Sequence, residues 1–93
     1  MNYQLIDPII FQWAQSHSFR ISTSYKDEEV RSIDIINAKG ERFQVWFDIP
    51  TKHHVGIHVW NYKKKKESLK KEWLVNIVDL ESILTEVFKI VSS

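Results

Sequence analysis

The segment 51–66, TKHHVGIHVWNYKKKK, holds the side chains of this chain that are best suited to chemistry. Three of the four histidines fall within six residues, and a tryptophan, a tyrosine and four consecutive lysines follow them. Clustered histidines can bind a metal ion or transfer protons, and lysines beside aromatic rings can bind nucleic acid. The secondary structure of the segment decides between these possibilities, because it determines which side chains lie together.

A metal site is not expected from these histidines. His54 and His58 have the spacing of a metal-binding pair on a helix, where residues four apart are neighbours. Here, however, they alternate with apolar residues, which indicates a strand: Val55, Ile57 and Val59. At about 3.3 Å per residue, side chains four apart on a strand are separated by about 13 Å. His53 and His54 point to opposite faces of such a strand, so we predict no metal ligands and no cofactor.

A catalytic site would need a base, a group that orients it, and a nucleophile or water close by. Asp34, Gln44 and His58 could form a row across three strands, with Arg20 near Asp34, and such a row could support acid–base catalysis. It could equally be an ordinary polar pairing between strands. The chain has no nucleophile motif, and its two glycines leave little material for a phosphate-binding loop. We therefore assign no catalytic residues.

A lysine cluster follows the histidines. Six lysines and two glutamates give the range 61–73 a local charge of +4, whereas the whole chain carries only +1. The lysines of this cluster are Lys63, Lys64, Lys65, Lys66, Lys70 and Lys71. They could bind the phosphates of a nucleic acid, which is the alternative prediction for function. They could also form a solvated loop, or a charged sheet edge that prevents association between sheets.

Both ends of the chain are predicted to be helical. Residues 7–17 begin with Asp7, a suitable N-cap, and the apolar residues that follow have helical spacing. Asp79 is a suitable N-cap for a second helix over residues 80–91. The apolar residues of this helix form one stripe: Leu80, Ile83, Leu84, Val87, Phe88 and Val91.

Between the helices, apolar and polar residues alternate with a period of two, which is typical of strands with one covered face. Four segments show the pattern, with inward-facing residues Phe19, Ile21, Thr23 and Tyr25; Ile33 and Ile35; Phe43, Val45 and Phe47; and Val55, Ile57 and Val59. Residues 72–77, EWLVNI, could add a short fifth strand.

Two connections predict how the central strands pair. Residues 37–41, NAKGE, fit a type I turn with Gly40 in the left-handed conformation. This turn pairs Ile35 with Phe43, Ile33 with Val45, and Asp34 with Gln44. Around residues 48–54, DIPTKHH, we expect a register that keeps the apolar faces aligned. It pairs Asp48 with His54, Trp46 with Gly56, and Gln44 with His58, and it would let the Trp46 ring lie over the glycine.

These elements predict a single α+β domain spanning residues 1–93, in the order α-β-β-β-β-α. Its core is an antiparallel four-stranded meander sheet, with the possible fifth strand at 72–77 and with both terminal helices packed on one face. The other face stays open unless the segment 61–77 folds back over it. The open face is then expected to carry Trp46, Trp60, Ile36, His54 and His58. Aromatic side chains outside a core are typical of protein-binding surfaces.

Length and composition agree with a small domain of this kind. Ninety-three residues with 43% hydrophobic content can form one modest core, and the absence of cysteine excludes disulfides and thiolate zinc sites. The sequence shows neither a signal peptide nor the roughly 20 apolar residues that span a bilayer, so we expect a cytoplasmic protein without a membrane partner. We predict a small non-catalytic module that binds a protein partner, or a second copy of itself, through the open face.

Overall fold

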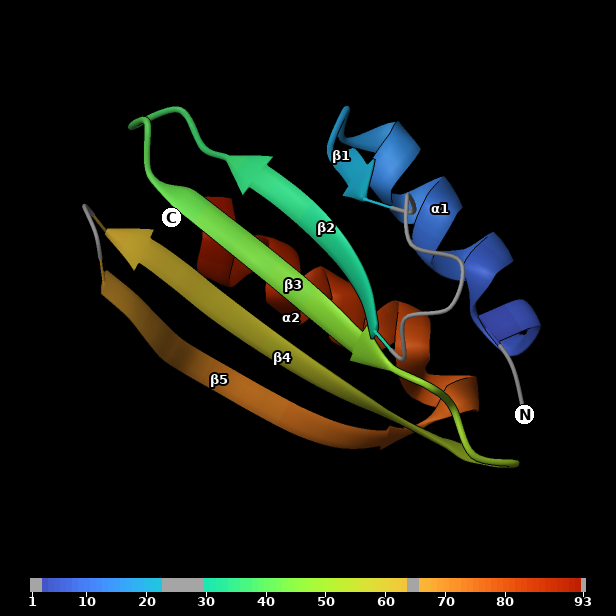
Figure 1. Ribbon diagram of the computed structural model, residues 1–93. Coiled ribbons are helices and arrows are strands. Elements are labelled where there is room, and N and C mark those ends of the chain that lie inside the picture. Colours follow the sequence, from blue (N-terminus) through green and yellow to red (C-terminus); the bar gives the residue numbers. More distant parts are fainter. Residues whose placement is uncertain (1–2, 23–29, 64–65, 93) are drawn as a thin grey trace.

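The computed structural model describes residues 3–22, 30–63 and 66–92, and the side chains of these except 22, 30, 63 and 66–68. The chain forms, in order, a 3-10 turn (Tyr3–Leu5), α1 (Asp7–Ser16), β1 (Arg20–Ser22), β2 (Val30–Ile36), β3 (Arg42–Asp48), β4 (His54–Lys63), β5 (Lys66–Asn76), a second 3-10 turn (Ile77–Asp79) and α2 (Leu80–Ser92). The strands form one antiparallel sheet in the order β1-β2-β3-β4-β5, a meander (Figure 1). The predicted α+β architecture is therefore confirmed.

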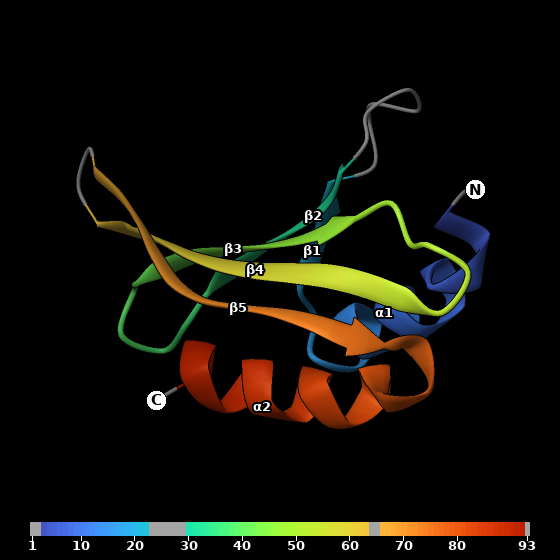
Figure 2. The same ribbon diagram turned by 90° about the horizontal axis from the view of Figure 1, so that it is seen from below.

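Both helices pack on the same face of the sheet, as Figure 2 shows. The residues that alternate along β2, β3 and β4 point toward the helices and form one core with them. Its buried members are Tyr3, Ile6, Ile10, Ala14, Ile33, Ile35, Phe43, Val45, Phe47, Val55, Ile57, Val59, Leu80, Leu84, Val87 and Val91. Among the described residues, no helix is long and apolar enough to cross a membrane.

The start of α1 differs from the expectation. Ile6 occupies the N-cap position of α1, and no described side chain caps the helix, so the assignment of Asp7 was wrong. Asp7 instead lies in the first turn, where the helix dipole favours a carboxylate, and accepts a hydrogen bond of 3.3 Å from Arg31 Nε. The second helix, α2, begins at Leu80 as expected, directly after Asp79, which is the last residue of the second 3-10 turn. The side chain of Asn76 caps that turn.

The first central hairpin has the predicted register, with Ile35 opposite Phe43 and Asp34 opposite Gln44. Gly40 has a φ of 79°, the left-handed conformation that the turn requires and that glycine adopts without strain. The local sequence of this turn was therefore sufficient to position both strands.

The second central hairpin differs from the predicted register by two residues. Trp46 lies opposite His58, and Gln44 lies opposite Trp60. A shift of two residues leaves every side chain on the same face of the sheet, so the apolar pattern could not distinguish the two registers. The connection is closed by Thr51, whose main-chain N–H donates to the carbonyl of His54 at 2.8 Å.

The fifth strand exists and is longer than the expected 72–77. The strand β4 continues to Lys63 and β5 begins at Lys66, so part of the lysine cluster belongs to strands. Two features of β5 obscured its alternation of apolar and polar residues. Its first half is rich in lysine, which is common on edge strands. In addition, Lys70 is an extra residue that forms a bulge opposite the step from Val59 to Trp60. The strand β5 therefore extends the sheet sideways, and the described residues of the segment 61–77 do not fold back over its open face. Of the expected first strand, residues 23–25 lie outside the described residues.

Candidate functional site

The face of the sheet opposite the helices, here called the open face, is formed by the residues that alternate with the buried ones. A pair of tryptophans lies near its centre. The rings of Trp46 on β3 and Trp60 on β4 are diagonal neighbours, with centroids 5.1 Å apart and an interplanar angle of 43°. Both side chains are partly exposed. The pair contributes contact area and aromatic interaction that a purely polar sheet face lacks.

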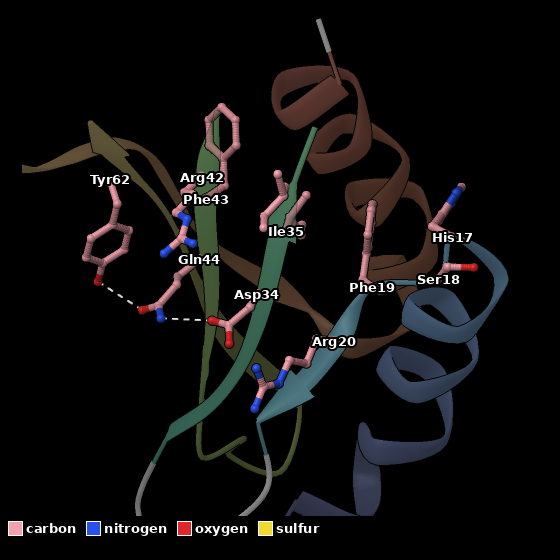
Figure 3. Close-up of a pocket in the computed structure, with 11 residues that line it drawn as sticks. His17, Ser18, Phe19, Arg20, Asp34, Ile35, Arg42, Phe43, Gln44 and Tyr62 are labelled. Atoms are coloured by element: carbon pink, nitrogen blue, oxygen red, sulfur yellow. Dashed lines mark hydrogen bonds between the residues drawn. The ribbon is translucent and has the colours of Figure 1, made fainter. Parts of the chain in front are cut away.

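The amide of Gln44 holds the tryptophan pair in place. Its Oε1 accepts hydrogen bonds from Trp46 Nε1 at 3.0 Å and from the Tyr62 hydroxyl at 2.9 Å. Its Nε2 donates to Asp34 Oδ1 at 2.8 Å, as Figure 3 shows. The network links β2, β3 and β4 and restrains the Trp46 ring. By contrast, Trp60 Nε1 is buried and has no hydrogen-bond partner among the described residues.

A histidine between two carboxylates lies next to the tryptophans. His58 Nε2 is 2.8 Å from Asp48 Oδ2 on β3, and His58 Nδ1 is 2.8 Å from Glu72 Oε2 on β5. Only a protonated imidazole can donate from both nitrogens. Burial lowers the pKa of His58, but the hydrogen bonds and charges of the two carboxylates outweigh this, so its pKa lies above the ordinary value. The two carboxylates therefore favour the protonated form of His58, which joins three strands through them.

Gly56 provides the space for this arrangement. A Cβ at position 56 would lie 2.5 Å from Asp48 Oδ2, so any larger residue would displace the carboxylate that bonds His58. The expectation that the Trp46 ring lies over Gly56 was wrong, because the two-residue shift in register brings Asp48 there instead.

The row of polar residues expected for catalysis is only partly formed. Asp34 and Gln44 are bonded as anticipated, but the next residue of the row is Trp60, not His58. Both ring nitrogens of His58 are occupied by carboxylates. Those carboxylates lie at opposite nitrogens and do not converge on a common point. Within the described part of the chain, no three His, Asp or Glu side chains are grouped so that they could hold a metal ion.

The residues predicted for protein binding are not all neighbours. Trp46, Trp60 and His58 lie together, whereas Ile36 and His54 lie at the far ends of their strands, β2 and β4, and are exposed. Ile36 has 64% of its surface exposed. Sequence reasoning missed two leucines of β5 on the open face, Leu69 (42% exposed, opposite Trp60) and Leu74 (76% exposed, opposite Gly56). The alternation in EWLVNI was the available signal for Leu74.

Lys70 and Lys71 are the members of the lysine cluster whose side chains the structure describes. The side chains of Lys63, Lys64, Lys65 and Lys66 lie outside the described set. Lys70, at the bulge, is exposed. Lys71 pairs with the inward-facing Val59, and its Nζ lies 5.2 Å from the centroid of the Trp73 ring, a cation–π contact.

No protein-family model, curated protein or solved structure matches this chain. The geometry of the open face is therefore the basis on which its function can be inferred.

Proposed function

We propose that the protein is a non-catalytic interaction module that binds a protein partner, or a second copy of itself, through the open face. The observation that carries the proposal is the uncovered tryptophan pair at the centre of a sheet face, with exposed leucines on the adjacent strand. Tryptophan is enriched among the residues that contribute most to binding between proteins. Exposed apolar side chains gathered on one face also favour an interface.

The polar residues around the pair support the same proposal. Gln44 restrains Trp46, and the carboxylates of Asp48 and Glu72 restrain His58, so the surface is ordered before a partner arrives. Binding to an ordered surface avoids part of the entropy cost of association. Ile36 and His54 extend the proposed contact area toward the two ends of the sheet.

The test is a double substitution, Trp46→Ala with Trp60→Ala. Because neither ring belongs to the core between sheet and helices, we expect the variant to keep its circular dichroism spectrum and a cooperative thermal transition. The variant should lose self-association, which light scattering measures as molar mass against concentration. If the wild type binds another protein instead, the variant should lose cross-linking to that partner. A matched control, Val78→Ala with Leu5→Ala, removes exposed apolar groups away from the open face and should bind like the wild type. Binding that survives the double substitution would contradict the proposal.

Nucleic-acid binding by the lysine cluster is the second candidate function. The observation that favours it is that four of the six lysines belong to two adjacent strands, β4 (Lys63) and β5 (Lys66, Lys70 and Lys71). Fluorescence anisotropy with a single-stranded RNA should show affinity that falls steeply with salt. Replacing Lys63–Lys66 by Gln should reduce the log–log slope by about 0.7 for each phosphate group that the variant no longer binds. The absence of binding at low salt would eliminate this candidate.

A further inference from the structure

A cleft lies at the edge of the sheet, beside the hairpin end of β2 and apart from the tryptophan pair. Its volume is about 550 Å³, within the range of roughly 300–1,000 Å³ that is common for ligand sites. Figure 3 shows that its walls come from β2, β3, β4 and the segment that leads from α1 into β1. The cleft therefore joins elements that are distant in the sequence.

The cleft borders an unpaired stretch of main chain. β1 pairs with β2 only from Ser32 to Asp34, so Ile36 extends beyond the first residue of β1. The main-chain N–H of Asn37 donates to the carbonyl of Glu41 on the β3 side. Since successive residues of an antiparallel strand direct their main-chain groups to opposite sides, the N–H and C=O of Ile36 point away from β3. On that side, no described strand pairs with Ile36.

The cleft extends on both faces of this edge. Phe19, Ile35 and Phe43 line it on the helix side, and Ile36 lies among polar residues on the open-face side. An extended peptide that paired with Ile36 would direct alternate side chains to the two faces. One side chain would therefore meet an apolar wall, and the next would meet a polar one.

The polar wall carries two arginines, Arg20 and Arg42. Among the described residues, no carboxylate lies within ion-pair distance of either guanidinium, whereas Arg31 is paired with Asp7. The one carboxylate of this wall, Asp34, accepts a hydrogen bond from Gln44. Guanidinium groups bind carboxylates in charge-assisted hydrogen bonds, so this wall favours an acidic side chain.

We infer that the cleft binds an extended acidic segment of a protein chain by strand addition to the edge of β2. The main chain of the segment pairs with Ile36, a carboxylate contacts Arg20 and Arg42, and an apolar side chain packs against Phe19. Strand addition of this kind takes affinity from main-chain hydrogen bonds and specificity from alternate side chains. The inference goes beyond the proposed function, because it uses the free edge of β2 and does not need the tryptophan pair, although Ile36 and Gln44 belong to both regions.

The probe is a blocked peptide, acetyl-VDVDV-amide, titrated to millimolar concentration while amide signals are followed by NMR. We expect the Ile36 amide to shift and to exchange more slowly with solvent. The asparagine analogue, acetyl-VNVNV-amide, should bind at least 10-fold more weakly, because it lacks the carboxylates. Equal binding of the two peptides, or no binding at all, would overturn the inference.

Protein variants provide the second half of the test. The double substitution Arg20→Gln with Arg42→Gln should weaken binding of the acidic peptide at least 10-fold. Lys39→Gln with Lys52→Gln, which removes the same charge from exposed positions outside the cleft, should bind like the wild type. Peptide binding should also persist in the Trp46→Ala, Trp60→Ala variant, which separates this site from the tryptophan pair. Weaker binding by the lysine control, or shifts confined to residues around Trp46, would contradict strand addition at Ile36.

Discussion

The two faces of the sheet are built from adjacent residues but stabilised in different ways. On β3, Val45 and Phe47 are fully buried against the helices. Trp46, which lies between them in the sequence, and Gln44, which precedes them, are partly exposed. The covered face is stabilised by burial of apolar surface. The open face is held by hydrogen bonds between side chains on neighbouring strands. The comparison indicates that residues of the open face can change at a modest cost in stability, which leaves that face available for binding.

The faces also differ in charge. The buried residues of the covered face are apolar apart from Asn61, whose side chain donates to the carbonyl of Arg42. The open face carries the triad of Asp48, His58 and Glu72, in which two carboxylates bond one imidazole. A dependence of stability on pH near neutrality should therefore originate on the open face.

The largest effect on stability is expected for a substitution on the covered face. Phe47→Ala should lower the free energy of unfolding by about 3–5 kcal/mol, because it leaves a cavity in a fully buried position. Its neighbour Trp46→Ala should cost at most about 2 kcal/mol, since the ring is partly exposed and can be replaced by water. Urea denaturation of both variants measures the difference. Equal destabilisation would show that the open face is as important for stability as the core.

A smaller effect concerns the protonation of His58. Because its folded pKa is raised, protonation stabilises the folded state fully below the unfolded pKa of about 6.5, and this contribution is lost as pH rises through the folded pKa. The free energy of unfolding should therefore fall from pH 6 to pH 8. His58→Gln should abolish this contribution and cost about 1 kcal/mol at pH 6.

The control for this prediction is His54→Gln, since His54 is exposed at the end of β4. It should keep the pH dependence of the wild type. If the free energy of unfolding of His58→Gln still falls from pH 6 to pH 8, the pH dependence originates elsewhere in the protein.

The smallest effect on stability is expected for Gly56→Ala. The new Cβ displaces Asp48 Oδ2 from His58, while alanine reduces the entropy of the unfolded chain, so the net change should stay within about 1 kcal/mol. The pKa of His58 should nevertheless fall, because one carboxylate has moved away. An NMR titration of the histidine ring signals measures this fall.

Gly40→Ala provides the matched comparison, because the positive φ of Gly40 makes any other residue strained. It should lower stability by about 1 kcal/mol without changing the pKa of His58. An unchanged pKa in Gly56→Ala would show that Asp48 can keep its bond to the imidazole after moving.

Particular residues show how far the sequence could lead. The assignment of Trp46 and Trp60 to the open face was possible because alternation is a local property. The bond between Asp34 and Gln44 was also predictable, because the turn at 37–41 determines the register of its hairpin. The triad of Asp48, His58 and Glu72 was missed, since its members come from three strands and meet only in the register that the second central hairpin adopts. The cleft beside Ile36 was missed because it depends on where β1 begins.

The sequence by itself determined the two helices, through a period near 3.6, and the face of the sheet that each central residue occupies, through a period of two. These periods are sufficient to predict the core, because burial acts on each helix or strand separately. The short connections then predict the order of the strands. Only the tertiary structure decided which side chains meet across the strands. Registers that differ by two residues bury the same side chains, so the choice between them depended on the connection closed by Thr51 and on the fit of Asp48 over Gly56. The contacts of His58 with its two carboxylates are a consequence of that choice.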